Sequence, residues 1–384
     1  MKLNLAANQW LKYDGYGGMA YGVAQALIRS GHQMYPVELD QRISKKPAWF
    51  YRAQGLDFSH VTVQLAPPNC WWSVPGRSVG WTMHESMTLP PKWAEYINKN
   101  SQWCIVPSGW LIPVFEEAGV KVPMAIVPGG INPDECPVLG QNHYRPYTFG
   151  ALADRGGRKG HQKVEMAFYK AFDWKNKDVA LLIKCRPESR PRQLDWSYAP
   201  DSRYTYWSSD LESMTDFYAQ IDAYICPAKC EGYGMSQREA AACGLPVVVQ
   251  RFSGTADNCD KWAIPLENYK LTESSMEGSG GLWAEPSLDE LVETMRYLYL
   301  HQDDAKAKAL KAAQWMRDNE TYAHSANKLV KTLNEWLGGP VPIDETPQGK
   351  IGDIHVITKI VEPIYEPIRS SSASSNGIKH RLTI

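Results

Sequence analysis

The sequence predicts an α/β protein made of two doubly wound domains that face one cleft. Apolar runs of strand length alternate with helical patterns along most of the 384 residues, a length that exceeds one ordinary domain core. Residues 230–244, CEGYGMSQREAAACG, place a glutamate and a glycine turn between a strand pattern and a helical pattern. A corner of this kind in a parallel sheet normally faces a ligand.

The first domain is predicted to open with a βαβ unit, as Rossmann-like domains do. Its first strand is followed by a glycine-containing loop and by a helix that Gly31 is placed to end. Strands are expected at 2–7, 32–40, 61–65, 78–83, 103–106 and 124–127, and helices at 19–30, 91–99 and 110–118.

A polar, proline-containing stretch at 137–147 predicts a linker, so the first domain is expected to cover 1–140 and the second 141–337. Strands are expected from Tyr147 and at 179–184, 223–227 and 245–250, with 281–286 rejoining the sheet edge. Helices are expected at 161–172, 211–221, 288–299, 304–319 and 322–337. Residues 186–207 are expected to be a solvated connection, with a substrate-contacting loop as the alternative. The tail, 338–384, is rich in proline and serine and is expected to be irregular.

Composition narrows the class of protein. A formal net charge of −1 gives no general attraction to nucleic acid or to anionic membranes. No apolar run is long enough to span a bilayer, and the first residues do not resemble a signal peptide. The eight cysteines are scattered without a C-x-x-C pair, which favours free thiols over disulfides or metal ligands. We therefore expect a cytoplasmic protein.

The first glycines fit two interpretations. Gly15-x-Gly17-x-x-Ala20 formally matches the dinucleotide fingerprint, and Glu38 or Asp40 lies where a ribose-binding acid would. In that fingerprint, however, the first glycine directly follows the strand, and here residues 8–14 intervene. The favoured interpretation is a mobile glycine loop whose backbone approaches a ligand. An NAD-dependent oxidoreductase remains the less favoured alternative.

The two glutamates of residues 230–244 differ in what explains them. Ser236 and Glu239 form the pattern of a capping box, with Ser236 at the N-cap, which would give Glu239 a structural role. Glu231 has no such local explanation, because it ends a strand pattern before a glycine turn. A carboxylate there costs desolvation unless it binds something. Glu231 therefore carries more of the functional inference.

Cations are expected at the same edge of the second sheet. Lys184 ends a strand, and Arg155, Arg158 and Lys159 lie in the first βα turn. These cations, together with the helix N-terminus near 234–237, would favour an anionic phosphate. Carboxylates that bind hydroxyls, together with cations that bind a diphosphate, are what a nucleotide-sugar pocket requires. The alternative is an ordinary basic turn that is exposed to solvent. The chain has no D-x-D triplet, so no divalent metal is expected.

His84 and Glu85 follow the strand predicted at 78–83, at the end where ligands of such sheets bind. An ordinary loop histidine with a solvated neighbour fits these two residues as well as a role in a site does.

The stretch from Glu231-Gly-Tyr-Gly-Met to Glu239-Ala-Ala-Ala-Cys-Gly-Leu-Pro-Val resembles the E-x7-E signature of retaining glycosyltransferases of family 4, which have the GT-B fold. Further segments resemble that family at 107–120, 127–132 and 149–160. The resemblance extends over roughly residues 1–337 and is strongest in the second half.

The resemblance implies that the second domain binds the donor and the first domain the acceptor. It implies that Glu231 contacts the donor sugar, that Glu239 contacts the ribose, and that Lys159 clamps the diphosphate. His84 would lie near the sugar. The donor site implied in this way comprises Gly17, Gly18, Arg155, Arg158, Lys184, Gly232, Tyr233, Gly234, Met235, Ser236 and Glu239.

The chain departs from the family pattern in two places. Ala151 stands where the family has an arginine, so Arg155 or Arg158 is expected to supply that cation. The family's acidic glycine-rich loop has residues 253–255 as its nearest equivalent. In the family a final helix crosses back to the first domain, a role that falls to 322–337.

The function implied is that of a metal-independent retaining hexosyl- or pentosyltransferase that uses a nucleotide-diphosphate sugar. The alternative from another class is a non-catalytic nucleotide-sugar or carbohydrate-binding protein on the same fold. The acceptor stays open among a glycan, a lipid-linked sugar, a small molecule and a modified nucleic-acid base.

Overall fold

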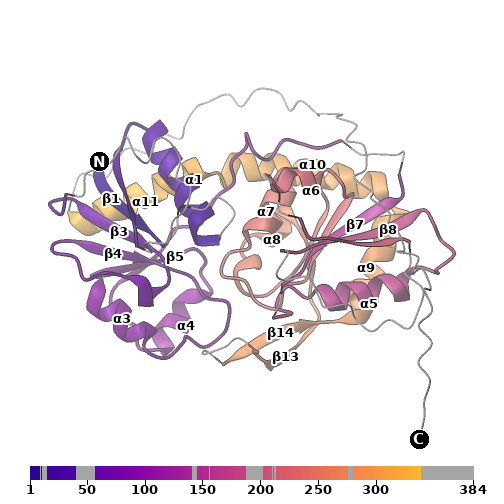
Figure 1. Ribbon diagram of the computed structural model, residues 1–384, viewed down its shortest axis with the longest axis horizontal. Helices are drawn as coiled ribbons and strands as arrows, with labels where there is room; N and C mark the ends of the chain where they lie inside the picture. Colours follow the sequence, from indigo (N-terminus) through magenta and orange to yellow (C-terminus); the bar gives the residue numbers. More distant parts are fainter. Residues whose placement is uncertain are drawn as a thin grey trace, which may run out of the picture.

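A computed structural model describes residues 1–8, 10, 15–39, 57–140, 145–154, 156–186, 202–209, 211, 213–275 and 280–338. Two six-stranded sheets lie side by side, each flanked by helices (Figure 1). The predicted pair of Rossmann-like, doubly wound domains is confirmed. The domain boundaries at 140 and 337 stay predictions, and Arg155 and residues 339–384 lie outside the described residues.

The first sheet is parallel throughout, in the order β2-β1-β3-β4-β5-β6. Its strands are buried apolar runs, as expected for a sheet covered on both faces; all five residues of β3 are buried. The strands are β1 (Lys2–Ala7), β2 (Gln33–Glu38), β3 (Val61–Leu65), β4 (Ser78–Trp81), β5 (Trp103–Val106) and β6 (Met124–Ile126). The helices are α1 (Gly15–Arg29), α3 (Trp93–Asn100) and α4 (Leu111–Glu117).

The second sheet is also parallel, in the order β12-β11-β10-β7-β8-β9. Its strands are β7 (Tyr147–Leu152), β8 (Val179–Lys184), β9 (Tyr204–Trp207), β10 (Ala223–Cys226), β11 (Val247–Gln250) and β12 (Ile264–Leu266). Its helices are α5 (His161–Ala171), α6 (Met214–Tyr218), α7 (Met235–Ala242), α8 (Cys259–Trp262), α9 (Leu288–Leu300) and α10 (Gln302–Asn319). The chain order reverses between β7 and β10, so ligands are expected at the carboxyl ends of these strands.

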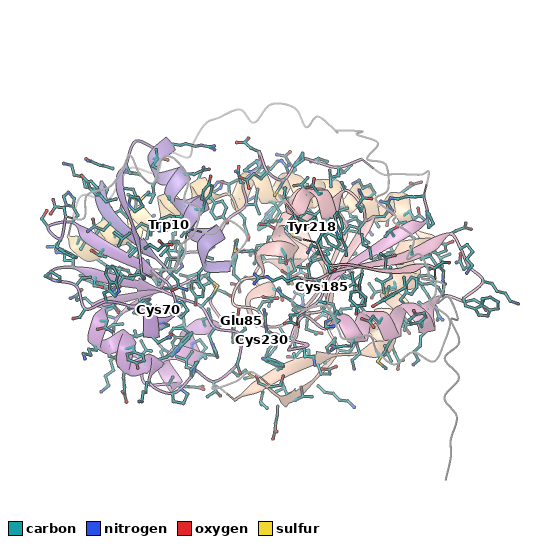
Figure 2. All side chains as sticks on the ribbon, in the orientation of Figure 1. Trp10, Cys70, Glu85, Cys185, Tyr218 and Cys230 are labelled. Atoms are coloured by element: carbon teal, nitrogen blue, oxygen red, sulfur yellow. The ribbon has the colours of Figure 1, made fainter. Side chains whose placement is uncertain are left out.

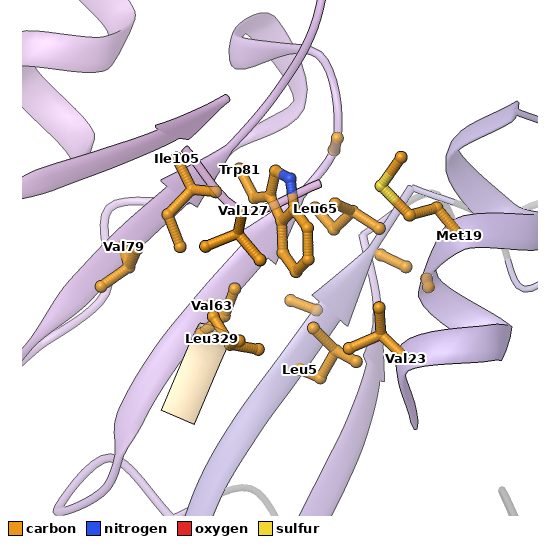
Figure 3. Close-up of a cluster of buried hydrophobic side chains, with 14 of the residues drawn as sticks. Leu5, Met19, Val23, Val63, Leu65, Val79, Trp81, Ile105, Val127 and Leu329 are labelled. Atoms are coloured by element: carbon orange, nitrogen blue, oxygen red, sulfur yellow. The ribbon is translucent and has the colours of Figure 1, made fainter. Parts of the chain in front are cut away.

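The last helix of the described residues, α11 (Tyr322–Leu337), returns to the first sheet, as the resemblance implied. Leu329 and Leu333 are fully buried in the core of the first sheet, and Trp336 stacks on Trp103 with ring centroids 5.8 Å apart. Figure 3 shows Leu329 among Val63, Trp81 and other side chains of that core. Burial of this apolar face anchors α11 to the first sheet.

Two predictions for the second half were wrong. The segment at 281–286 does not rejoin the main sheet; β14 (Leu282–Pro286) pairs antiparallel with β13 (Tyr269–Glu273) in a separate hairpin. Residues 204–207, expected in a solvated connection, form the edge strand β9. The β13–β14 hairpin extends from the second half towards the first (Figure 1). All eight cysteines are free, as predicted. No helix among the described residues is long and apolar enough to cross a membrane.

Candidate functional site

A cavity of about 800 Å³ lies between the two sheets. The second half lines it with residues that follow the carboxyl ends of β7, β8 and β10, where the doubly wound order reverses. The first half contributes one face of α1, Met83 and Glu85 after β4, and three residues of the segment 132–136. A volume of this size suits a ligand as large as a nucleotide sugar.

Glu231 lies at the inner wall of the cavity, where it is 5% exposed. Its Oε1 lies 2.6 Å from Lys159 Nζ, and its Oε2 lies 2.9 Å from Arg158 Nη1. Gln237 donates a third hydrogen bond to it at 3.3 Å. Burial alone would raise the pKa of Glu231, but the two cations lower it to about 2. Glu231 is therefore an ionised carboxylate held by two cations.

Arg158 is the centre of a charged cluster. Its guanidinium donates a hydrogen bond of 2.7 Å to the carbonyl oxygen of Cys230, and it lies 4.0 Å from the carboxylates of Glu85 and of Asp154. Burial would lower the pKa of Arg158, but the carboxylates of Glu231 and Glu85 more than offset this and raise it. The guanidinium thus stays charged beside the cavity, in a place where it can pair with an anion.

The turn that carries Lys159 is fixed by Gly160. This glycine has φ +74°, and a Cβ on it would lie 2.5 Å from the carbonyl oxygen of Pro227. A larger residue would therefore force the turn away from β10. Lys184, the last residue of β8, also lines the cavity, and its Nζ donates to the Cys185 carbonyl at 2.6 Å. Of the predicted cations, Arg158, Lys159 and Lys184 thus line one cavity.

The predicted capping box at Ser236 is wrong. The N-cap of α7 is Gly234, with φ +87°, which moves Ser236 into the first turn. There its side chain contacts Gln237 Oε1 and the Tyr224 hydroxyl. The left-handed backbone at Gly234 is what the sequence pattern failed to indicate. The capping box therefore does not explain Glu239. Its side chain lines the cavity, where it accepts a hydrogen bond of 3.2 Å from the Tyr218 hydroxyl.

The glycine turn before α7 is held in place by Glu320, which lies far from it in the sequence. Glu320, between α10 and α11, accepts a hydrogen bond of 2.7 Å from Arg238 Nε and one of 3.0 Å from the Tyr233 hydroxyl. The Arg238 guanidinium lies 4.0 Å from the Tyr233 ring centroid and 4.7 Å from that of Trp262. This buried pair fixes the residues that precede Gly234.

The predicted mobile glycine loop is also wrong in part. Helix α1 begins at Gly15, so Gly17 and Gly18 lie in its first turn and are buried. Gly18 lines the cavity and Gly17 does not. A Cβ at Gly22 would lie 2.3 Å from the Tyr322 ring, so part of this glycine pattern serves the packing of α1 on α11. The N-terminus of α1 still faces the cavity through Gly15, which favours anions there.

His84 does not line the cavity. Its Nε2 lies 2.9 Å from the Thr88 carbonyl, and its ring meets Trp93 edge to face at 5.2 Å. Burial lowers the pKa of His84 to about 4, so the imidazole is neutral near pH 7. Its neighbour Glu85 does line the cavity (Figure 2 shows it between the two halves).

Most of the predicted donor-site residues do line this cavity. They are Gly18, Arg158, Lys159, Lys184, Glu231, Gly232, Tyr233, Gly234, Met235, Ser236 and Glu239. Sequence reasoning missed Tyr21 and Gln25 on α1, and it also missed Glu135 and Thr215. The spacing of Tyr21 and Gln25, four residues apart on a predicted helix, was the available signal that they share a face.

Comparison with known proteins identifies the family and the fold. The model of a family described as "Family 4 Glycosyltransferase in conflict systems" matches residues 119–329. No curated protein matches the sequence.

Solved structures share the fold at low identity. Sucrose-phosphate synthase from Thermosynechococcus elongatus is 10% identical, with a TM-score of 0.63 over 88% of this chain and 99% of that one. HepE from Anabaena, in complex with UDP and glucose, is 11% identical, with a TM-score of 0.60 over 87% of this chain and 100% of its own. A glycosyltransferase from Rickettsia africae is 14% identical, with a TM-score of 0.63 over 88% and 99%. These likenesses establish the two-domain GT-B architecture. The matched family model covers more than half of the chain, and the protein belongs to the family 4 glycosyltransferases in conflict systems.

Proposed function

We propose that this protein is a retaining glycosyltransferase that moves a sugar from a nucleotide-diphosphate sugar to a hydroxyl acceptor without a divalent metal. The observation that carries the proposal is the cluster of Arg158, Lys159 and Glu231 near the N-terminus of α7, which lines the same cavity as Glu239. The binding of UDP and glucose by a protein of the same fold, HepE, supports a nucleotide sugar as donor.

In this proposal the diphosphate binds to Arg158, Lys159 and the first amides of α7. Both cations are already held at the cavity wall by Glu231, so little side-chain ordering is required when an anion arrives. The positive end of α7 adds to the attraction. Glu239, which is beside Tyr218, accepts hydrogen bonds from the ribose, and Glu231 accepts them from the sugar.

The chemical step breaks the bond between the anomeric carbon and a phosphate oxygen, and the electron pair leaves with the diphosphate. A new bond forms on the same face between that carbon and the acceptor oxygen. The acceptor hydroxyl gives its proton to the departing diphosphate, so no protein base is consumed. Arg158 and Lys159 stabilise the charge that develops on the leaving group.

Replacing Lys159 by alanine tests the diphosphate clamp. A hydrogen bond to a charged group contributes about 1.5–3 kcal/mol, so nucleoside-diphosphate affinity should fall about 10- to 100-fold. Lys163→Ala is the matched control, because Lys163 pairs with Glu285, 3.0 Å away, and does not line the cavity. Affinities are measured by calorimetry after a thermal-shift panel of nucleotide sugars has identified the donor. Equal affinity in the Lys159→Ala variant and the wild type would refute the clamp.

Two readouts separate the remaining alternatives. Release of nucleoside diphosphate from the bound sugar distinguishes an enzyme from a binding protein, and Glu231→Ala should lower that release at least tenfold. The configuration of the new glycosidic bond, measured by NMR, tests retention. An inverted product would overturn the retaining mechanism.

A further inference from the structure

The β13–β14 hairpin reaches from the second half to the loop that follows β4 in the first half, residues 85–88. The Trp283 indole nitrogen donates 2.7 Å to the carbonyl oxygen of Glu85. The Ser86 hydroxyl donates 2.6 Å to the Gly280 carbonyl. Gly281 lies so close that a Cβ on it would be 2.6 Å from Ser86 Oγ and 2.9 Å from the Thr88 nitrogen. The hairpin therefore holds this loop through several close contacts.

Trp283 is itself rigidly placed. It is 3% exposed on β14, in register with Thr272 of β13, and Lys229 Nζ lies 6.0 Å from its ring centroid. Lys229 in turn pairs with Glu285 at 2.5 Å. An indole fixed in this way can hold the backbone that it contacts.

Glu85 occupies the first-half wall of the cavity. Its side chain is 29% exposed, and Oε1 lies 4.0 Å from Arg158 Nη2. The cations that line the cavity among the described residues, Arg158, Lys159, Lys184 and Arg186, all belong to the second half. On the described part of α1 and in the loop after β4, residues 82–88, Glu85 is the charged group that lines it, and Glu135 is the other charged lining residue of the described first half. The second-half wall also includes the carboxylates Asp154, Glu231 and Glu239 and so carries both signs, whereas the charged lining residues of the described first half are carboxylates.

We propose that Glu85 determines acceptor binding by accepting a hydrogen bond from an acceptor hydroxyl, and that Trp283 is the residue that positions it. This inference rests on the proposed function. The reacting hydroxyl still gives its proton to the diphosphate. Glu85 receives a second hydrogen, from a neighbouring hydroxyl or, when water is the acceptor, from the other O–H bond.

The chemistry of this wall defines an acceptor class. A carboxylate beside the reacting group favours a neutral polyol and opposes a phosphate or another anion at that place. The same carboxylate helps to orient the acceptor relative to the anomeric carbon, which mainly affects the rate of transfer.

The positioning role is tested by hydrogen exchange of residues 83–88 in the full chain, without any ligand. Trp283→Phe keeps an aromatic ring and removes the N–H donor, and Ser86→Ala removes the second link. Each should raise exchange of these amides several-fold. Trp10→Phe is the matched control, because the Trp10 indole also donates to a first-half carbonyl, that of Val37 at 2.9 Å, and Val37 belongs to β2, three strands away from β4. Unchanged exchange in both Trp283→Phe and Ser86→Ala, or an equal rise in the control, would overturn the positioning role.

The acceptor role is tested by hydrolysis of UDP-glucose, UDP-N-acetylglucosamine and GDP-mannose, with water as the acceptor. Glu85→Ala should lower kcat at least tenfold with KM for the donor within threefold, and Glu85→Gln should recover part of the loss. Trp283→Phe should lower kcat in the same direction. An unchanged kcat, or a kcat loss matched by weaker UDP binding, would refute the role of Glu85. If the wild type hydrolyses none of the three donors and does not bind UDP, the proposed function fails, whereas the exchange result still decides the positioning role.

Discussion

Replacing Glu320 by glutamine tests how the glycine turn at the cavity is held in place. Glu320 Oε2 accepts hydrogen bonds from Arg238 and from Tyr233, and it lies between α10 and α11. The Arg238 side chain is 1% exposed and that of Glu320 is 9% exposed. The substitution therefore leaves a buried guanidinium without its counter-charge while keeping the shape of the side chain.

The magnitude follows from these contacts. Removing one partner of a buried ion pair costs about 3–5 kcal/mol, and glutamine still accepts one hydrogen bond. Arg238 also donates to the carbonyls of Gly254 and Asp257, at 3.2 and 3.4 Å, which retains part of its stabilisation. We therefore expect Glu320→Gln to lower the free energy of unfolding by about 2–3 kcal/mol, and Glu320→Ala by about 3–5 kcal/mol.

The assay is urea unfolding followed by tryptophan fluorescence and by circular dichroism, which also checks whether both probes report one transition. Asp304→Asn is the control, because Asp304 pairs with Lys308 on the surface and its loss should cost less than about 1 kcal/mol. UDP affinity should fall in Glu320→Gln, since Tyr233 lines the cavity. A loss of stability no larger than that of the control would refute the bracing role.

Three further predictions concern pH and backbone conformation. The pKa of His84 is lowered to about 4, so its neutral imidazole contributes stability to the fold that is present above pH 6.5 and is lost as the pH falls towards 4. His84→Gln should therefore remove up to about 3 kcal/mol from the pH dependence of the free energy of unfolding in that range, measured by urea unfolding. The carboxyl of Glu231 has a pKa of about 2, so it stabilises the fold above the pKa that it has in the unfolded chain. The difference in free energy of unfolding between the wild type and Glu231→Gln should therefore narrow by about 3 kcal/mol from pH 5 to pH 2. A difference that does not change with pH would contradict the ion pairs. Gly234→Ala should cost more than about 1 kcal/mol in thermal unfolding, because φ is +87° and the new Cβ would lie 2.8 Å from the Thr255 methyl; an unchanged melting temperature would show that the turn adjusts freely.

Local pattern predicted most of the two sheets. β1, β3, β5 and β8 have the predicted bounds, because each is an apolar run flanked by polar or turn residues. The pattern failed where tertiary contacts decide. β9 is half-buried and aromatic, and only its pairing with β8 identifies it as a strand. β13 is exposed along its whole length, so it lacks the alternation that predicts strands.

The site was predicted in the same uneven way. Glu231, Lys159 and Glu239 were identified from residue type and spacing, and they meet at one cavity. The glycines were harder, because φ at Gly234 is decided by packing, and it moved the N-cap away from Ser236. His84 was predicted in the site, but its ring turns to Thr88 and Trp93, whereas the adjacent Glu85 lines the cavity. Which of two neighbouring side chains faces a cavity depends on the backbone direction of the loop.

The sequence alone determined the class of architecture and the residue types of the donor side, because strand periodicity, helix periodicity and the spacing of Glu231 and Glu239 are local properties of the chain. Only the tertiary structure decided which charges pair, since Arg158 and Glu231 are 73 positions apart and meet through the sheet order. It also decided that the β13–β14 hairpin contacts the loop after β4, nearly 200 positions away in the sequence. The first contact arises from the order of the strands within one sheet and the second from the position of the hairpin beside the first half, and no local pattern encodes either.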